Sequence, residues 1–226
     1  MKHRHILRKL KCMSNPEAVA GMARFGISHR NALGVSIPDL RKMAKEVGKK
    51  HKLADQLWRS GIHEARILAG MIDDPEMVTE AQMENWAKDF DSWDLCDQCC
   101  SNLFDKTDFA REKAIEWTSK DEEFVKRAGF VLMACIAVDD KKAEDKRFER
   151  FFPLIIREAA DERNFVKKAV NWALRQIGRR NLRLNKKAIK TAKGIQKLDS
   201  KSAKWISSDA LRELTSQGIQ RRLRVG

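Results

Sequence analysis

The chain has 226 residues, 42% of them hydrophobic, with a formal net charge of +14 and a sequence pI of about 9.7. This composition is typical of a folded protein that buries a sizeable core, and it excludes a disordered chain. The positive charge favours a polyanionic partner such as nucleic acid or an anionic membrane surface, although solvated helix faces also carry charge of this kind.

Sheet-based, membrane-spanning and secreted disulfide-bonded proteins are disfavoured. The 4 prolines and 11 glycines are few, and apolar and polar residues do not alternate regularly, so an all-α fold is expected. The sequence has no apolar run of about 18 residues. Its five cysteines are an odd number, and three of them cluster at 96, 99 and 100. We therefore expect one domain over residues 1–226, with reduced thiols, no membrane segment and a cytoplasmic location.

Local start and stop signals predict the helices in chain order. Asn15 before Pro16, Thr79 with Gln82, Asp91 and Thr107 are read as N-caps of the helices that follow them. Pro153 is expected to kink or begin a helix. The expected helices span 16–25, 38–49, 51–60, 62–73, 80–89, 92–104, 108–118, 121–138, 145–160, 164–180, 183–197 and 200–215, followed by a basic tail at about 217–226.

The turn markers recur along the chain. Asp73-Asp74-Pro75, Asp105-Lys106, Asp139-Asp140 and Arg180-Asn181 are separated by about 31 to 41 residues, which is the length of one helix pair in an α-solenoid. Stacked pairs create a curved surface with a groove, whereas a plain helical bundle, the alternative, does not. Formal charge is +9 in residues 1–50, −8 in 51–150 and +13 in 151–226, so two basic ends flank an acidic middle.

The predicted helix 164–180 combines an aromatic side chain with cations on its polar face. Val166, Val170, Ala173 and Ile177 form one apolar stripe, and Trp172 points away from it. Three cations share the side of Trp172: Lys168, Arg175 and Arg179. This pattern favours a nucleotide contact flanked by phosphate-binding cations. Packing of Trp172 against the next repeat is the alternative.

The acidic middle contains Trp93 and Asp97 on one side of a predicted helix, opposite a buried stripe of Leu95, Cys99 and Leu103. A carboxylate in a DNA-binding groove repels phosphate unless it stabilises positive charge that develops there. The alternative is that Asp97 caps or pairs with a neighbouring repeat.

Arg127 is a cation in line with Phe124, Val131 and Val138 on an apolar helix face. It needs an anion, which is either a carboxylate of an adjacent helix or a DNA phosphate.

At these positions the sequence resembles the AlkD-like DNA alkylation repair proteins, a family of DNA glycosylases built from HEAT-like helical repeats. The resemblance spans most of the chain. It rests on the order and spacing of Leu33-Gly34-Val35 through Arg41, Trp93-Asp-x-x-Asp97, Arg127 and Trp172-x-x-Arg175.

The resemblance implies roles for individual residues. Asp97 matches the catalytic aspartate, Trp93 and Trp172 match the tryptophans that contact the lesion-bearing nucleotide, and Arg127 matches an arginine that contacts the DNA backbone. Phe25 stands where some members have a tyrosine, so the aromatic ring is kept and a hydroxyl is lost. Some members keep the scaffold without detectable activity.

The leading hypothesis is a monomeric glycosylase that removes positively charged N3- or N7-alkylpurines from double-stranded DNA without a cofactor. The alternatives are a non-catalytic protein that binds damaged or branched DNA, and a protein-interaction scaffold that docks through its acidic middle. Cys96-x-x-Cys99-Cys100 lacks the second ligand pair of a structural zinc site, so no metal is expected.

Overall fold

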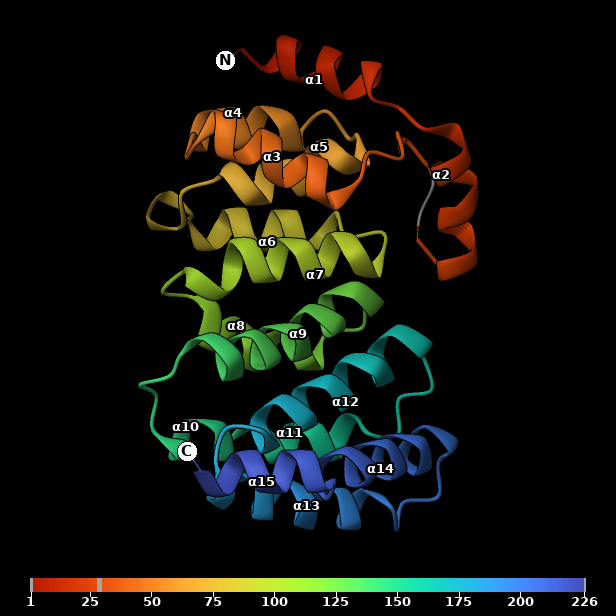
Figure 1. Cartoon of the computed structure of the whole chain (residues 1–226), viewed down its shortest axis with the longest axis vertical. Coiled ribbons are helices and arrows are strands. Elements are labelled where there is room, and N and C mark those ends of the chain that lie inside the picture. Colours follow the sequence, from red (N-terminus) through yellow and green to blue (C-terminus); the bar gives the residue numbers. More distant parts are fainter. Residues whose placement is uncertain (1, 28–29, 226) are drawn as a thin grey trace. The chain divides into compact units, whose positions relative to one another are not determined.

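The computed structural model describes residues 2–27 and 30–225, and in this part of the chain all regular structure is helical (Figure 1). The all-α prediction is confirmed. The α-helices are α1 (His3–Cys12), α2 (Pro16–Met22), α3 (Ile37–Val47), α4 (His51–Trp58), α5 (His63–Ile72), α6 (Glu80–Lys88), α7 (Trp93–Asn102), α8 (Ala110–Glu116), α9 (Glu123–Asp139), α10 (Asp145–Glu149), α11 (Phe151–Glu158), α12 (Asn164–Gly178), α13 (Leu182–Ile195), α14 (Lys201–Leu214) and α15 (Gln217–Val225). Short 3-10 helices are η1 (Ala23–Phe25), η2 (Pro75–Met77), η3 (Phe104–Lys106) and η4 (Trp117–Ser119).

The helices group into two compact units, Met1–Phe109 and Ala110–Gly226, which we call unit 1 and unit 2. In unit 1, α5 packs against α3, α4 and α7. In unit 2, α9 packs against α8 and α12, and α14 packs against α12 and α13. Each unit thus stacks a helix on those one to three places along the chain. In the described residues we find no helix with the length and apolar character needed to cross a membrane.

Each unit has its own apolar core. In unit 1, Trp58 and Trp86 stack with ring centroids 3.9 Å apart and planes 4° apart, and Phe90 and Phe104 surround them. In unit 2, α9 is buried on nearly all sides.

Two expected caps are confirmed and two are wrong. The side chains of Asn15 and Thr79 accept hydrogen bonds from Ala18 N at 3.1 Å and Gln82 N at 3.2 Å. Asp91 is not a cap, because Ser92 holds the N-cap position of α7. Thr107 is not a cap either, because α8 begins only at Ala110 and the Thr107 hydroxyl donates to Phe104 O at 2.8 Å.

The structure adds a helix at each end of the sequence. Helix α1 was not expected, because Ile6 and Leu10 are separated by charged residues and form too short an apolar pattern to be noticed in the sequence. Both side chains are fully buried. Residues 217–225 are helical instead of a tail, and Gly226 lies outside the described residues. Helix α15 docks through Leu223, 8% exposed, and through Gln220 Nε2, which donates to Leu214 O at 2.7 Å.

The expected helix 145–160 is divided in two at Arg150. Pro153 lies in the first turn of α11, where its missing N–H removes no intrahelical hydrogen bond.

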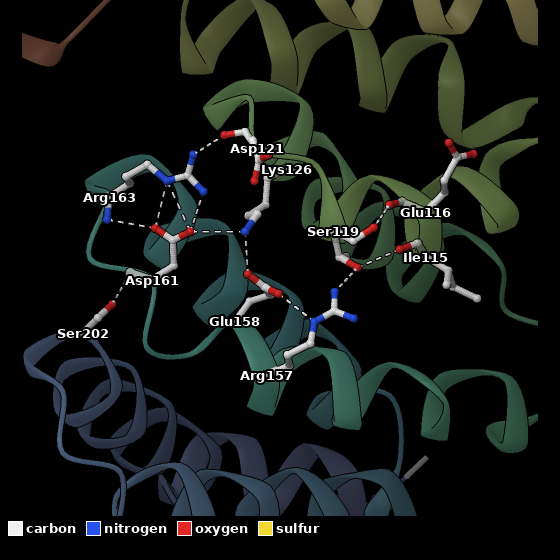
Figure 2. A network of polar contacts seen from close by, with 11 residues as sticks. Ile115, Glu116, Ser119, Asp121, Lys126, Arg157, Glu158, Asp161, Arg163 and Ser202 are labelled. Carbon is white, nitrogen blue, oxygen red and sulfur yellow. Dashed lines mark hydrogen bonds and ion pairs between the residues drawn. The ribbon is translucent and has the colours of Figure 1, made fainter.

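A polar network in unit 2 links η4, α9, α11, the segment before α12, and α14 (Figure 2). Lys126 Nζ lies 2.6 Å from Glu158 Oε2 and 3.5 Å from Asp161 Oδ2. Arg163 Nη2 lies 2.6 Å from Asp161 Oδ2, and Ser202 Oγ donates to Asp161 O at 2.7 Å. The network therefore holds the starts of α9, α12 and α14 together.

Candidate functional site

Helix α7 places Trp93 and Asp97 one turn apart on its partly exposed side. Its other side is the expected stripe, since Leu95, Cys99 and Leu103 have no exposed surface. Cys96 and Cys100 are also fully buried, and burial raises the pKa of the Cys99 thiol well above 9.0. These cysteines therefore behave as small apolar side chains.

The N-terminal end of α7 is held by a histidine–carboxylate pair. His63 Nε2 lies 2.8 Å from Asp94 Oδ2, and Ser92 Oγ donates to Asp94 Oδ1 at 2.7 Å. Burial disfavours the charged form of each partner. The hydrogen bond and the opposite charge outweigh it, so the pKa of His63 is raised and that of Asp94 is lowered. This hydrogen-bonded pair therefore fixes the helix turn between Trp93 and Asp97.

Phe25 and Trp93 come together within unit 1. Trp93 Nε1 donates to Phe25 O at 2.9 Å, and the Phe25 side chain is 70% exposed. The backbone carbonyl makes this contact, so it does not require the phenolic hydroxyl that a tyrosine would supply.

A buried carboxylate fixes the loop before α3 and, through it, the start of α2. Glu64, 2% exposed, accepts hydrogen bonds from Leu33 N at 2.8 Å and Gly34 N at 2.6 Å. Gly34 has a φ of +77°, and a Cβ there would lie 2.3 Å from Asn15 O. Only glycine fits this close approach. Asn15 is also the N-cap of α2, which leads to Phe25.

In unit 2, Arg127 is 5% exposed and connects α9 with α12. Its Nη1 donates to Phe165 O at 2.6 Å, so one of its partners is a backbone carbonyl. Lys168, one turn further along α12, is exposed, and its Nζ lies 6.0 Å from the centroid of the Phe165 ring. Arg127, Phe165 and Lys168 thus form one cluster at the start of α12.

The middle of α12 carries Trp172, partly exposed, opposite the expected stripe of Val166, Val170, Ala173 and Ile177, which is fully buried. The two arginines that follow form ion pairs with α14. Arg175 Nη1 lies 2.6 Å from Glu213 Oε2 and 3.4 Å from Asp209 Oδ2. Arg179 Nη1 lies 3.5 Å from Glu213 Oε1. Of Lys168, Arg175 and Arg179, Lys168 is therefore the most exposed.

The supporting residues His63, Asp94, Glu64, Asp209 and Glu213 were not identified from the sequence. The length of the repeat is a sequence signal that could have identified these residues. In unit 1, three contacts join residues 31 positions apart: Leu33 with Glu64, Trp58 with Asp89, and His63 with Asp94. In unit 2, three join residues 38 apart: Arg127 with Phe165, Asn171 with Asp209, and Arg175 with Glu213. Side chains of opposite charge or matching hydrogen-bonding character that lie 31 or 38 residues apart could therefore have been predicted to contact each other.

Helices stacked on their neighbours, with contacts repeated at 31 and 38 residues, define a protein of HEAT-like helix pairs. The model of the DNA alkylation repair enzyme family matches residues 6–214. The chain therefore belongs to this family, as its resemblance to the AlkD-like proteins predicted.

One solved structure confirms the HEAT-like fold. This structure, described as a new family of proteins related to the HEAT-like repeat DNA glycosylases with affinity for branched DNA structures, is similar at a TM-score of 0.78 and 19% identity, over 94% of this chain and 95% of that chain. A designed armadillo repeat protein in complex with the peptide (KR)4 has a TM-score of 0.37 and 13% identity, over 82% of this chain and 88% of that chain. None of the curated proteins matches the chain.

Proposed function

We propose that the protein is a DNA glycosylase that hydrolyses the N-glycosidic bond of N3- or N7-alkylated purines in duplex DNA, with Asp97 as the catalytic carboxylate. The observation that carries this proposal is the position of Asp97 one turn from Trp93 on the partly exposed side of a helix whose other side is buried. Membership of the DNA alkylation repair enzyme family supports the choice of substrate class.

The chemistry requires few groups. A purine alkylated at N3 or N7 carries a positive charge and leaves as a neutral base, so no general acid and no cofactor are needed. The sugar left behind has oxocarbenium character, and a nearby carboxylate stabilises this charge and positions the attacking water. An aromatic ring favours a cationic nucleotide through cation–π attraction of about 0.5–2 kcal/mol, and Trp93 in unit 1 and Trp172 in unit 2 are each candidates for this contact.

The cations of unit 2 have separate tasks in this proposal. Lys168 is exposed and binds a phosphate of the DNA backbone. Arg175 and Arg179 also contribute, but their pairing with Glu213 reduces the charge that they offer to DNA. Arg127 is nearly buried, so it acts mainly by positioning the start of α12 through Phe165 O. The protein is proposed to act as a monomer.

The test is single-turnover release of 7-methylguanine and 3-methyladenine from methylated duplex DNA. The wild type is compared with Asp97→Asn, which keeps the shape and removes the charge, and with Asp91→Asn, a matched change at an exposed residue before α7. We expect the rate to fall by on the order of 10²-fold or more in Asp97→Asn only. Equal rates in all three proteins would exclude Asp97 as the catalytic group.

A second candidate is a non-catalytic protein that binds damaged or branched DNA. It is favoured by the similarity to the structure described as having affinity for branched DNA. Absence of base release by the wild type, with tight DNA binding retained, would establish this candidate over the glycosylase.

A further inference from the structure

A cavity of about 800 Å³ in unit 1 lies at the N-terminal ends of α1 and α4. Five cationic side chains line it, and none of its lining residues is acidic: the cations are Lys2, Arg4, Lys49, Lys50 and Lys52. His3 and His51 also line the cavity. This concentration of like charge is unfavourable unless an anion shares the space.

The backbone adds to the positive potential. No described side chain caps α1 or α4, and neither helix has an acidic residue in its first turn. The first N–H groups of both helices and their dipoles therefore favour negative charge at these ends.

The basic side chains divide into two that contact Asp73 and four, which we call the rim, that form no ion pair in the described part of the chain. Lys49 Nζ donates to Asp73 O at 2.6 Å, and His51 Nδ1 lies 2.8 Å from Asp73 Oδ1, a fully buried carboxylate. The rim consists of Lys2, Arg4, Lys50 and Lys52, all exposed. Within residues 2–27 and 30–225, none of these four side chains forms an ion pair. The rim is therefore available to a ligand.

We propose that this cavity binds phosphate groups of the DNA backbone, as a second contact separate from the nucleotide that meets Asp97. The inference rests on the proposed function to the extent that DNA is the ligand. Lysine, arginine and the N-terminal ends of helices together suit phosphate oxygens. The rim cations are exposed and lie at the starts of two helices, so they suit a long polyanion that passes over the opening better than an enclosed small anion.

The cavity is distinct from the candidate site of unit 1. None of its lining residues belongs to α7, and Phe25, Trp93 and Asp97 are not among them. In Figure 1 the N-terminal end of α1 lies on the left of unit 1, whereas α2, which leads to Phe25, lies on the right. A DNA segment held at the cavity is therefore not the nucleotide beside Trp93.

Two charge reversals test the cavity without weakening the helices. Arg4→Glu and Lys52→Glu place acidic residues in the first turns of α1 and α4, where the helix dipole stabilises them. The control is Lys186→Glu with Lys190→Glu, two exposed lysines of α13 that give the same change in net charge. Circular dichroism and thermal unfolding verify that each double variant is folded.

The measurement is the affinity for an undamaged 30-base-pair duplex as a function of salt, which does not depend on base excision. We expect the slope of log Kobs against log[salt] to become shallower by about 2 in the cavity variant, roughly 0.9 for each lost phosphate contact. The control should keep the wild-type slope. The inference would be overturned if the slope became equally shallow in the control, or if it stayed at the wild-type value in both variants.

A second probe separates DNA from a small phosphate ligand. Calorimetric titration with inorganic tripolyphosphate should detect binding to the wild type and the control but not to the cavity variant. If tripolyphosphate binds in this way while the DNA slopes of all three proteins agree, the occupant is a free phosphate compound and the proposed DNA contact is wrong. A wild type that releases no methylated base but has the expected slopes would contradict only the glycosylase.

Discussion

The pair of His63 and Asp94 controls stability through two protonation steps with opposite signs. The pKa of Asp94 is lowered from 3.8, so its contribution is present above that value and is lost as pH falls through its folded pKa. The pKa of His63 is raised from 6.5, so its contribution is present below that value and is lost as pH rises through its folded pKa. The pair is therefore most stabilising between about pH 4 and 6.5.

We predict that His63→Gln lowers the free energy of unfolding by about 1.5–3 kcal/mol at pH 5.5, the range for hydrogen bonds to charged groups. The decline of wild-type stability above pH 6.5 that comes from His63 should disappear in the variant. Urea unfolding between pH 4 and 8 measures both effects, and His5→Gln, at an exposed histidine, is the matched control. A variant that keeps the full decline of the wild type would contradict the assignment to His63.

At the scale of elements, α12 separates a cation that is free to bind DNA from cations that also hold α14. Lys168→Ala should change the free energy of unfolding by less than about 0.5 kcal/mol, because its side chain is exposed. Arg175→Ala should cost about 1–2 kcal/mol, because Glu213 and Asp209 lose a partner in a partly buried setting.

In DNA binding the order of these two variants should be reversed. We expect Lys168→Ala to weaken affinity for duplex DNA more than Arg175→Ala or Arg179→Ala, with little dependence on sequence. Chemical denaturation and fluorescence anisotropy provide the two measurements on the same proteins. Unchanged binding in all three variants would remove the proposed DNA contact from α12.

The stripes on α7 and α12 could be predicted because period and burial are local properties of a helix, and Leu95 and Val166 are buried as expected. The N-caps of helices were predicted less accurately, since Ser92 and not Asp91 is the N-cap of α7. Helix α1 was missed because only two apolar residues hold it. The partners of Arg127 and Arg175 come from the next repeat, so the residues of one helix could not identify them.

For the whole molecule, the charge pattern and the family together favour DNA over a protein partner. Residues 1–50 and 151–226 carry +9 and +13, while residues 51–150 carry −8 and include Asp97. The single groove expected from stacked repeats stays a prediction. If DNA is the partner, binding must release counterions, and the number released is set by the basic ends.

We therefore predict that affinity for undamaged duplex DNA falls steeply with salt, with a slope of log Kobs against log[salt] of about −4.5 to −5.5, which corresponds to roughly five or six phosphate contacts. Asp97→Asn should bind as tightly as the wild type or tighter at every salt concentration, because a carboxylate near DNA repels phosphate. It should leave the slope unchanged, since no phosphate contact is lost. A slope near zero would instead favour the protein-interaction scaffold, because docking through the acidic middle needs no contact with phosphate. Tighter binding combined with lost base release in Asp97→Asn would mean that the carboxylate opposes ground-state binding and acts on the charge that develops during bond cleavage.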